Sequence, residues 1–171
     1  MIYLPQRAVF IHIPRAAGNS VTSAIASTCA GKGIDIIVGT GGGIQNWAKM
    51  KRHTRAFVLK EIIDEWDDIY KFAINRPMEE RVKSVAKLIQ RDIDKNIHED
   101  PTCPEAWKRV LKNEDKDYWR VFMSHTFDWY TKGENGEDLG VETYEFSEIN
   151  NKWHEICDKC RIPQCVLPRL N

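Results

Sequence analysis

The sequence contains no apolar run long enough to cross a lipid bilayer, and it lacks an early basic segment followed by the apolar stretch of a secretory signal. Its charges also balance, because 25 Lys and Arg residues accompany 25 Asp and Glu residues. A chain with zero net charge has no overall field that would attract nucleic acid or an anionic lipid surface. We therefore expect a cytoplasmic protein whose partners include neither nucleic acid nor a membrane.

The sequence also lacks the phosphate-binding motifs of common ATPases and kinases. Neither PRAAGNS (14–20) nor the glycine-rich GTGGG (39–43) is followed by the Lys-Ser or Lys-Thr step of a P-loop, and neither has the spacing of a dinucleotide fingerprint. We interpret GTGGG as a surface loop. A nucleotide kinase with a degenerate loop is therefore the least favoured function for this sequence.

The five cysteines are an odd number, which favours free thiols over a closed disulfide framework. Three of them lie near His154, at Cys157, Cys160 and Cys165, and this spacing allows a zinc or redox site. A lone CxxC is a weak signal, however, and the helical period of INNKWHEICDKC places Trp153 on one face with Cys157 and Cys160. We expect these cysteines to pack in the core and expect no metal.

Strand and helix patterns alternate along the 171 residues without a repeat or an evident linker, which predicts a single domain over 1–171. The predicted strands are 7–13, 34–38, 69–75, 140–145 and 164–167, and the predicted helices are 19–29, 54–63, 78–96, 147–160 and a looser region over 104–122. This order predicts a layered α/β fold with a mainly parallel sheet.

The stretch FIHIPRAAGNS (10–20) places Arg15 on a turn of small residues between a strand and a helix. A helix N-terminus offers backbone N–H groups and the positive end of a dipole, so such a turn binds anions readily. The alternative is a tight connection in which Arg15 points to solvent, and this stretch alone does not decide between the two.

A second stretch, FAINRPMEERVKSV (72–85), repeats this arrangement. Arg76 ends a predicted strand, and Arg81 and Ser84 share one face of the following helix. An arginine at a strand end and a hydroxyl on the next helix can hold a phosphate between them. A structural Arg76 paired with a neighbouring glutamate is the alternative, but two strand-end sites together indicate a ligand with two separated phosphate groups.

These two stretches resemble the opening and the second phosphate motif of carbohydrate-type sulfotransferases. Three further stretches resemble the same family in the same order: KRHTRAFVLKEIIDEWDDIYKFA (51–73), YEFSEINNKWHEICDKCRIP (144–163) and LPRLN (167–171). The resemblance is weakest over 86–135. Members of the family continue beyond the position of Asn171, so we expect a member shortened at its C-terminus.

The resemblance implies a three-layer, P-loop-like fold and a sulfuryl donor, 3′-phosphoadenosine 5′-phosphosulfate. The 5′-phosphosulfate would lie on the backbone N–H groups of Ala17, Gly18, Asn19 and Ser20, with the hydroxyl of Ser20 assisting. Arg15 stands where the family usually has lysine and would neutralise charge on the departing oxygen. Arg76 and Ser84 match the positions that bind the 3′-phosphate.

The acceptor, a saccharide or another small hydroxyl compound, needs a general base. His53 matches the family's histidine and lies in the basic stretch that includes Lys49, Lys51 and Arg55. We expect such neighbours to keep His53 neutral, and Glu61 is the second choice for the base. The alternative function is a non-catalytic relative that binds the nucleotide without turnover.

Overall fold

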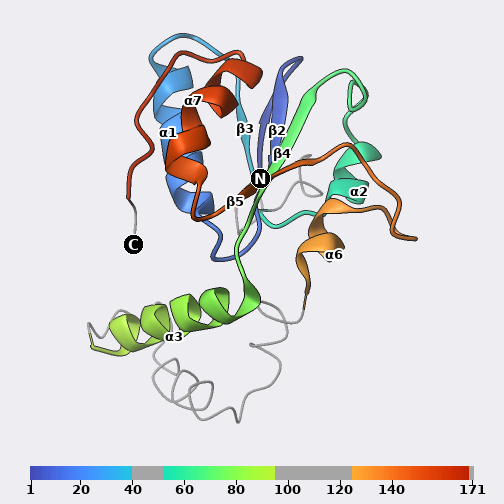
Figure 1. Ribbon diagram of the computed structural model, residues 1–171. Coiled ribbons are helices and arrows are strands. Elements are labelled where there is room, and N and C mark those ends of the chain that lie inside the picture. The colour runs from blue at the N-terminus through green and yellow to red at the C-terminus, as the bar shows by residue number, and fades with distance from the viewer. Residues whose placement is uncertain (40–51, 95–124, 170–171) are drawn as a thin grey trace. The chain divides into compact units, whose positions relative to one another are not determined.

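The computed structural model describes residues 1–39, 52–94 and 125–169. These residues belong to two compact units: one combines Met1–Arg76 with Phe127–Asn171, and the other is Pro77–Thr126. The first unit contains the sheet (Figure 1). The second contains α3 (Met78–Asp94). The single domain over 1–171 stays a prediction.

The sheet has five strands in the order β3-β1-β2-β4-β5. Their bounds are Ile2–Leu4 (β1), Ala8–Ile11 (β2), Ile37–Val38 (β3), Tyr70–Asn75 (β4) and Glu142–Glu145 (β5). Strand β2 is parallel to β4, and β4 is parallel to β5, whereas β1 is antiparallel to both β2 and β3. The α/β class is therefore confirmed, but the sheet is mixed, and the predicted mainly parallel sheet is wrong on the β1 side.

The antiparallel side of the sheet arises from a hairpin that the sequence pattern did not reveal. Leu4 accepts a hydrogen bond from the backbone N–H of Arg7 at 3.0 Å, and Gln6 adopts a positive φ of 58° between them. This turn folds β1 back onto β2. A run of three apolar residues is too short to produce a recognisable period, which is why β1 was not predicted.

Helices cover both faces of the sheet (Figure 1), with α1 (Gly18–Ala30) and α7 (Ile149–Lys159) on one side and α2 (Ala56–Lys60) and α6 (Phe127–Thr131) on the other. Helix α2 is shorter than the predicted 54–63, and α6 was not predicted. The predicted strand over 164–167 is irregular chain. There the carbonyl of Cys165 accepts a hydrogen bond from Trp153 Nε1 at 2.9 Å, so a side chain satisfies this carbonyl instead of a strand ladder.

Several predicted features lie outside the described residues. They are the predicted helical region over 104–122, the last two residues of the helix over 78–96, and residues 40–43 of GTGGG.

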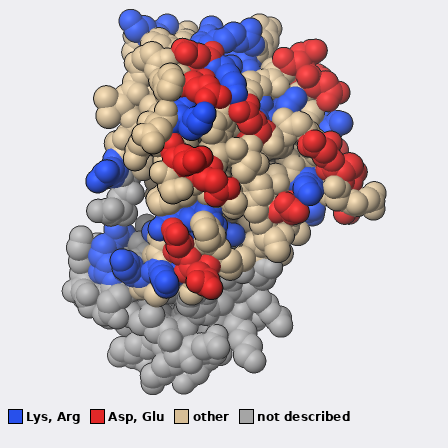
Figure 2. Space-filling view, viewed as in Figure 1, with Lys and Arg blue, Asp and Glu red and all other residues tan. Residues whose placement is uncertain are grey.

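The core lies on both faces of the two central strands. All four residues of β2 are buried, and so are Lys71, Phe72, Ala73 and Ile74 in β4. Burial on both faces is what helices on both sides of a sheet produce. On the face in Figure 2, acidic and basic side chains are interspersed, in keeping with the zero net charge. None of the described helices is long and apolar enough to cross a membrane.

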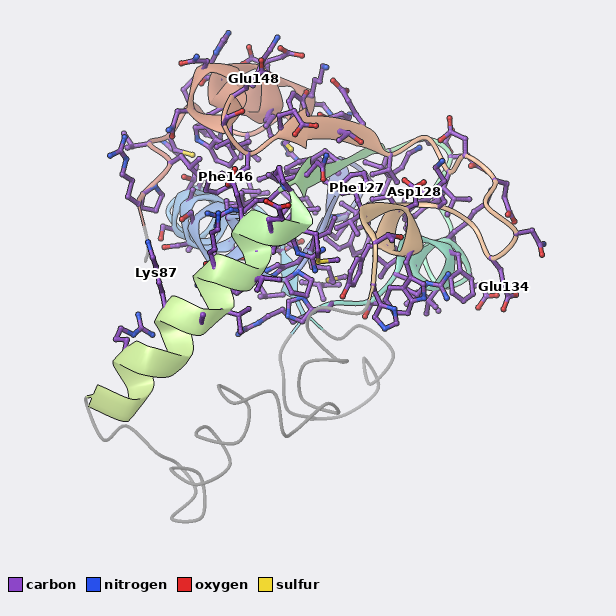
Figure 3. All side chains as sticks on the ribbon, turned by 60° about the horizontal axis from the view of Figure 1, so that its bottom comes forward. Lys87, Phe127, Asp128, Glu134, Phe146 and Glu148 are labelled. Carbon is purple, nitrogen blue, oxygen red and sulfur yellow. The ribbon has the colours of Figure 1, made fainter. Side chains whose placement is uncertain are left out.

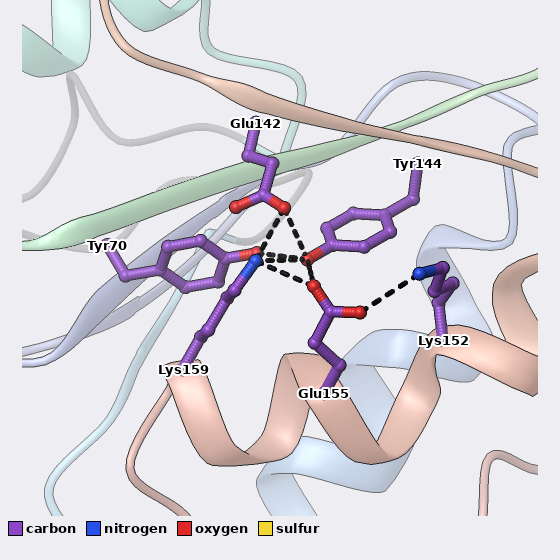
Figure 4. Close-up of polar contacts among 6 residues, drawn as sticks. All are labelled: Tyr70, Glu142, Tyr144, Lys152, Glu155 and Lys159. Atoms are coloured by element: carbon purple, nitrogen blue, oxygen red, sulfur yellow. Dashed lines mark hydrogen bonds and ion pairs between the residues drawn. The ribbon is translucent and has the colours of Figure 1, made fainter.

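A polar cluster ties α7 to the amino ends of β4 and β5 (Figure 4). The Tyr144 hydroxyl lies 2.9 Å from the Tyr70 hydroxyl and donates to Glu142 Oε1 at 2.8 Å. Lys159 Nζ donates to Glu142 Oε1 at 2.6 Å, to Glu155 Oε1 at 2.7 Å and to the Tyr144 hydroxyl at 3.2 Å. Burial raises the pKa of Tyr70, and the hydrogen bond to Tyr144 adds to this increase, so both phenols stay neutral.

The Tyr144 hydroxyl is the shared member of this cluster. We expect Tyr144→Phe to lower the free energy of unfolding by about 1–2 kcal/mol, because it leaves the half-buried Tyr70 hydroxyl without its partner. Urea denaturation would measure the loss. Lys152→Gln, which removes only the exposed ion pair with Glu155, is the control and should change stability by less than about 0.5 kcal/mol. Equal losses of stability in the two variants would show that the Tyr144 hydroxyl is not a stabilising member of this cluster.

Candidate functional site

The candidate site lies at the carboxyl ends of the parallel strands β2 and β4. Ile11, the last residue of β2, pairs with Ala73 in β4, so both strands end at the same edge of the sheet. The turn that carries Arg15 follows β2, and Arg76 directly follows β4. Open α/β sheets bind ligands at this edge, beyond the carboxyl ends of their strands.

The turn after β2 has an unusual backbone. Arg15 and Ala17 adopt positive φ angles of 62° and 58°, while Ala16 between them and Gly18 after them do not. A side chain at positive φ costs free energy, and such residues gather at functional sites. The N–H of Ala16, between Arg15 and Ala17, donates to the carbonyl of Ile13 at 3.3 Å, so contact with an anion would fall to the N–H groups that follow Ala16.

Helix α1 begins at Gly18 directly after this turn. Its N-cap residue, Ala17, has no side-chain atom that can accept a hydrogen bond from the first helical N–H groups, and the first turn carries no acidic residue. The positive end of the helix therefore lacks a carboxylate of its own first turn. An anion at this position would find backbone donors and a favourable dipole.

Arg76 links the ends of three strands. Its Nη1 donates to the carbonyl oxygen of Arg15 at 3.2 Å, and its guanidinium carbon lies 4.1 Å from the ring centre of Phe146. Phe146 directly follows β5 (Figure 3), and its N–H donates to the carbonyl of Asn75 at 2.8 Å. Arg76 is thus fixed next to the turn that carries Arg15, at the edge where the sequence predicted it.

His53 is oriented by the backbone at the end of β2. Its Nδ1 lies 2.8 Å from the carbonyl oxygen of His12. Because a carbonyl only accepts hydrogen bonds, Nδ1 carries the proton, and Nε2 of the neutral ring is the proton acceptor. This tautomer is the one that a general base at Nε2 needs. The preceding residue, Arg52, is tied to β1, since its carbonyl accepts a hydrogen bond from the amine of Met1.

His12 is a buried histidine of the site and is 5% exposed. Its ring occupies the place where a side chain on Gly18 would begin, because an added Cβ would lie 1.8 Å from His12 Nε2. The two histidine rings are in edge contact, with centres 4.7 Å apart. Burial lowers the pKa of His12 to about 2, and the neighbouring N-terminal amine, His53 and Arg52 lower it further. His12 is therefore neutral at physiological pH.

The other residues that the sequence predicted for the site lie on α1, at the end of α2, on α3 or outside the described residues. Asn19 is exposed and Ser20 is buried in the first turn of α1, while Glu61 is exposed at the C-terminal end of α2. Ser84 is half-buried on α3 in the other unit, so its pairing with Arg76 stays a prediction. Lys49 and Lys51 lie outside the described residues.

The cysteines near the C-terminus pack as the helical period predicted. Cys157 and Cys160 have no exposed surface and belong to the core, and Cys157 Sγ lies 3.9 Å from Cys165 Sγ. Burial raises the pKa of the Cys157 thiol to about 12, so this thiol is protonated at neutral pH. Among residues 1–39, 52–94 and 125–169, no three His, Cys, Asp or Glu side chains gather in a way that could hold a metal ion.

No family model matches the chain, and neither does any curated protein or solved structure. The functional interpretation therefore depends on the motifs and on the geometry of this site. His12 is the site residue that sequence reasoning took for a packing residue. The sequence carried no signal for this contact, because it depends on where Gly18 lies in three dimensions.

The contact between His12 and Gly18 yields a double-mutant test. We expect Gly18→Ala to destabilise the protein by about 1–3 kcal/mol, because the new methyl group would overlap the His12 ring. In a His12→Ala background the same substitution should cost little, since the ring is gone. Chemical denaturation of the four proteins would measure the coupling. Additive effects would show that the methyl group is accommodated elsewhere.

The neutral state of His12 predicts a loss of stability in acid. Its pKa is about 2 in the folded protein and near 6.5 in the unfolded chain, so the unfolded state binds the extra proton between these values. Stability should fall as the pH drops below about 6.5, by up to about 1.4 kcal/mol per pH unit from this group. Between pH 6 and 4 the denaturation free energy of His12→Gln should depend less steeply on pH by that amount. His154→Gln, at an exposed position, is the control and should keep the original slope.

Proposed function

We propose that this protein transfers a sulfuryl group from 3′-phosphoadenosine 5′-phosphosulfate to a hydroxyl of a saccharide or another small acceptor. The observation that carries the proposal is the hydrogen bond from His53 Nδ1 to the carbonyl of His12. It presents the accepting nitrogen of a neutral imidazole beside the strand end that leads into the anion-binding turn. A base and an anion site at one sheet edge are what sulfuryl transfer requires.

The donor side of the reaction uses the turn and α1. The backbone N–H groups of Ala17, Gly18, Asn19 and Ser20 at the start of α1 would bind the 5′-phosphosulfate. The Arg15 guanidinium would offset the negative charge that develops on the bridging oxygen. Arginine supplies this charge at any ordinary pH but cannot donate its proton, so Arg15 acts as an electrostatic group and not as an acid.

The acceptor side of the reaction uses His53. The acceptor oxygen forms a bond to sulfur while the bond from sulfur to the bridging phosphate oxygen breaks. The hydroxyl proton passes to His53 Nε2, and the electron pair of the broken bond remains on 3′,5′-adenosine bisphosphate. Nδ1 keeps its hydrogen bond to the carbonyl of His12 throughout, which stabilises the imidazolium that forms.

The 3′-phosphate would bind at Arg76. A guanidinium can bind two phosphate oxygens at once, and the position of Arg76 against Phe146 favours recognition at a fixed place. The proposal extends to the fold, which we take to be a three-layer variant of the P-loop-like architecture with an added antiparallel hairpin.

Transfer of labelled sulfuryl from the donor to a panel of saccharides tests the proposal. We expect Arg15→Ala to lower turnover by roughly a hundredfold or more, because it removes charge stabilisation from the transition state. His53→Ala should lower the rate by about two to four orders of magnitude and leave nucleotide affinity unchanged. His154→Ala, an exposed histidine of the same unit, is the matched control and should keep the full rate.

Calorimetry of nucleotide binding distinguishes the reasons for which sulfuryl transfer could fail in this test. Tight binding of 3′,5′-adenosine bisphosphate without transfer to any acceptor would favour the non-catalytic alternative. Full activity of His53→Ala would place the base elsewhere, and Glu61→Gln would be the next variant. Tighter binding of ATP than of the bisphosphate would contradict the donor itself.

A further inference from the structure

We propose that His12 is a buried hydrogen-bond donor of the anion site at the start of α1 and contacts the same tetrahedral oxyanion as the first N–H groups of the helix. This inference deepens the proposed function, because it adds a side chain to the site that would hold the donor's 5′-phosphosulfate. It extends equally to inorganic sulfate or phosphate at that site.

The ring nitrogens of His12 have no hydrogen-bond partner among the described residues, although only 5% of this residue is exposed. The hydrogen bond to His53 uses only the backbone carbonyl of His12. Among the described residues, the fully buried side-chain atoms without a partner are Thr22 Oγ1 and Trp66 Nε1, so the His12 nitrogens keep a small exposed surface that a ligand could contact.

The ring is directed at the first residue of the helix. Nε2 is the His12 atom closest to the position of a Cβ on Gly18, at 1.8 Å, and the neighbouring carbon Cδ2 follows at 1.9 Å. The polar edge of the His12 ring thus lies at the N-terminus of a thirteen-residue helix. The N-cap residue of that helix, Ala17, makes no side-chain cap hydrogen bond. The glycine at this position is what allows the ring to reach the base of the helix.

The surroundings select an oxyanion and not a cation. The positive end of α1, the cationic Arg15 and the guanidinium of Arg76 at the same turn all oppose a bound cation. A neutral imidazole has one N–H and one acceptor nitrogen, and the tautomer with its N–H toward the ligand suits sulfate, which has no proton to donate. Two positive charges would repel a protonated His12, so a neutral donor adds a hydrogen bond without adding charge.

Packing alone is the competing explanation for His12. Its ring stacks on Phe10 with centres 5.7 Å apart and contacts the ring of His53. If packing were its whole purpose, an apolar aromatic ring would serve equally well. A donor role requires a nitrogen, and the amide nitrogen of glutamine lies close to the position of histidine Nε2.

The experiment uses the full chain labelled with nitrogen-15 at histidine. The ring signals of His12, assigned by their loss in His12→Gln, are followed during titration with 3′,5′-adenosine bisphosphate, sodium sulfate and sodium phosphate. We expect the His12 nitrogen signals to move with saturation by at least one of these ligands. Affinity for that ligand should fall about tenfold or more in His12→Phe and be largely retained in His12→Gln.

The outcomes separate this inference from the proposed function. Movement of the His12 signals with sulfate or phosphate, but no binding of the nucleotide, would support the donor role of His12 and contradict the proposed sulfuryl donor. Nucleotide binding and sulfuryl transfer with unmoved His12 signals and equal affinities in the three proteins would overturn this inference alone. Binding of none of the three ligands would overturn it as well. The titration of the unmutated chain decides for or against the donor role even if His12→Phe does not fold.

Discussion

The parallel pairing of β2 with β4 is the constraint on which the rest of the site depends. The register of Ile11 opposite Ala73 makes both strands end at one edge, so two arginines that are 61 residues apart in sequence meet there. Arg76 then reaches the carbonyl of Arg15, and Phe146 at the end of β5 supports its guanidinium from the other side. A shift of one residue in this register would turn every side chain of β2 to the opposite face and remove the site along with the core.

The charge at the carboxyl edge of the sheet depends on the different burial of His12 and His53, because His12 is buried and His53 is only half-buried. Their rings are 4.7 Å apart, and a proton on one disfavours a proton on the other. Burial decides which ring stays neutral, because it lowers the pKa of His12 to about 2. The tautomer of His53 is set by the carbonyl oxygen of the same residue, His12. His12 thus contributes a neutral ring through its side chain, and its main-chain carbonyl orients the ring of His53.

The sequence predicted those parts of the fold and the site that depend on local pattern. Arg15 on a turn before α1, Arg76 after β4 and the core position of Cys157 and Cys160 follow from periodicity and small-residue turns. The hairpin of β1 was not predicted because a strand of three residues is too short to show an alternating pattern. The strand predicted over 164–167 was wrong, because the carbonyl of Cys165 accepts a hydrogen bond from the Trp153 side chain instead of from a neighbouring strand. The buried role of His12 depends on where Gly18 lies in three dimensions, and spacing along the chain does not give that position.

The two ends of the sheet differ in how completely their polar groups are paired. At the amino ends, Tyr144 and Lys159 share two carboxylates and a second phenol, so each charge has a partner and the cluster can only lose stability when altered. At the carboxyl ends, two residues adopt costly positive φ angles and a buried ring lacks a hydrogen-bond partner among the described residues. Networks that are complete specify a fold, whereas local strain and unmet hydrogen bonds persist only where the rest of the fold holds them. The strained turn at the carboxyl ends is held by the packed strands on which it stands, and under the proposed function the donor's anion would be the partner of the N–H groups that follow it.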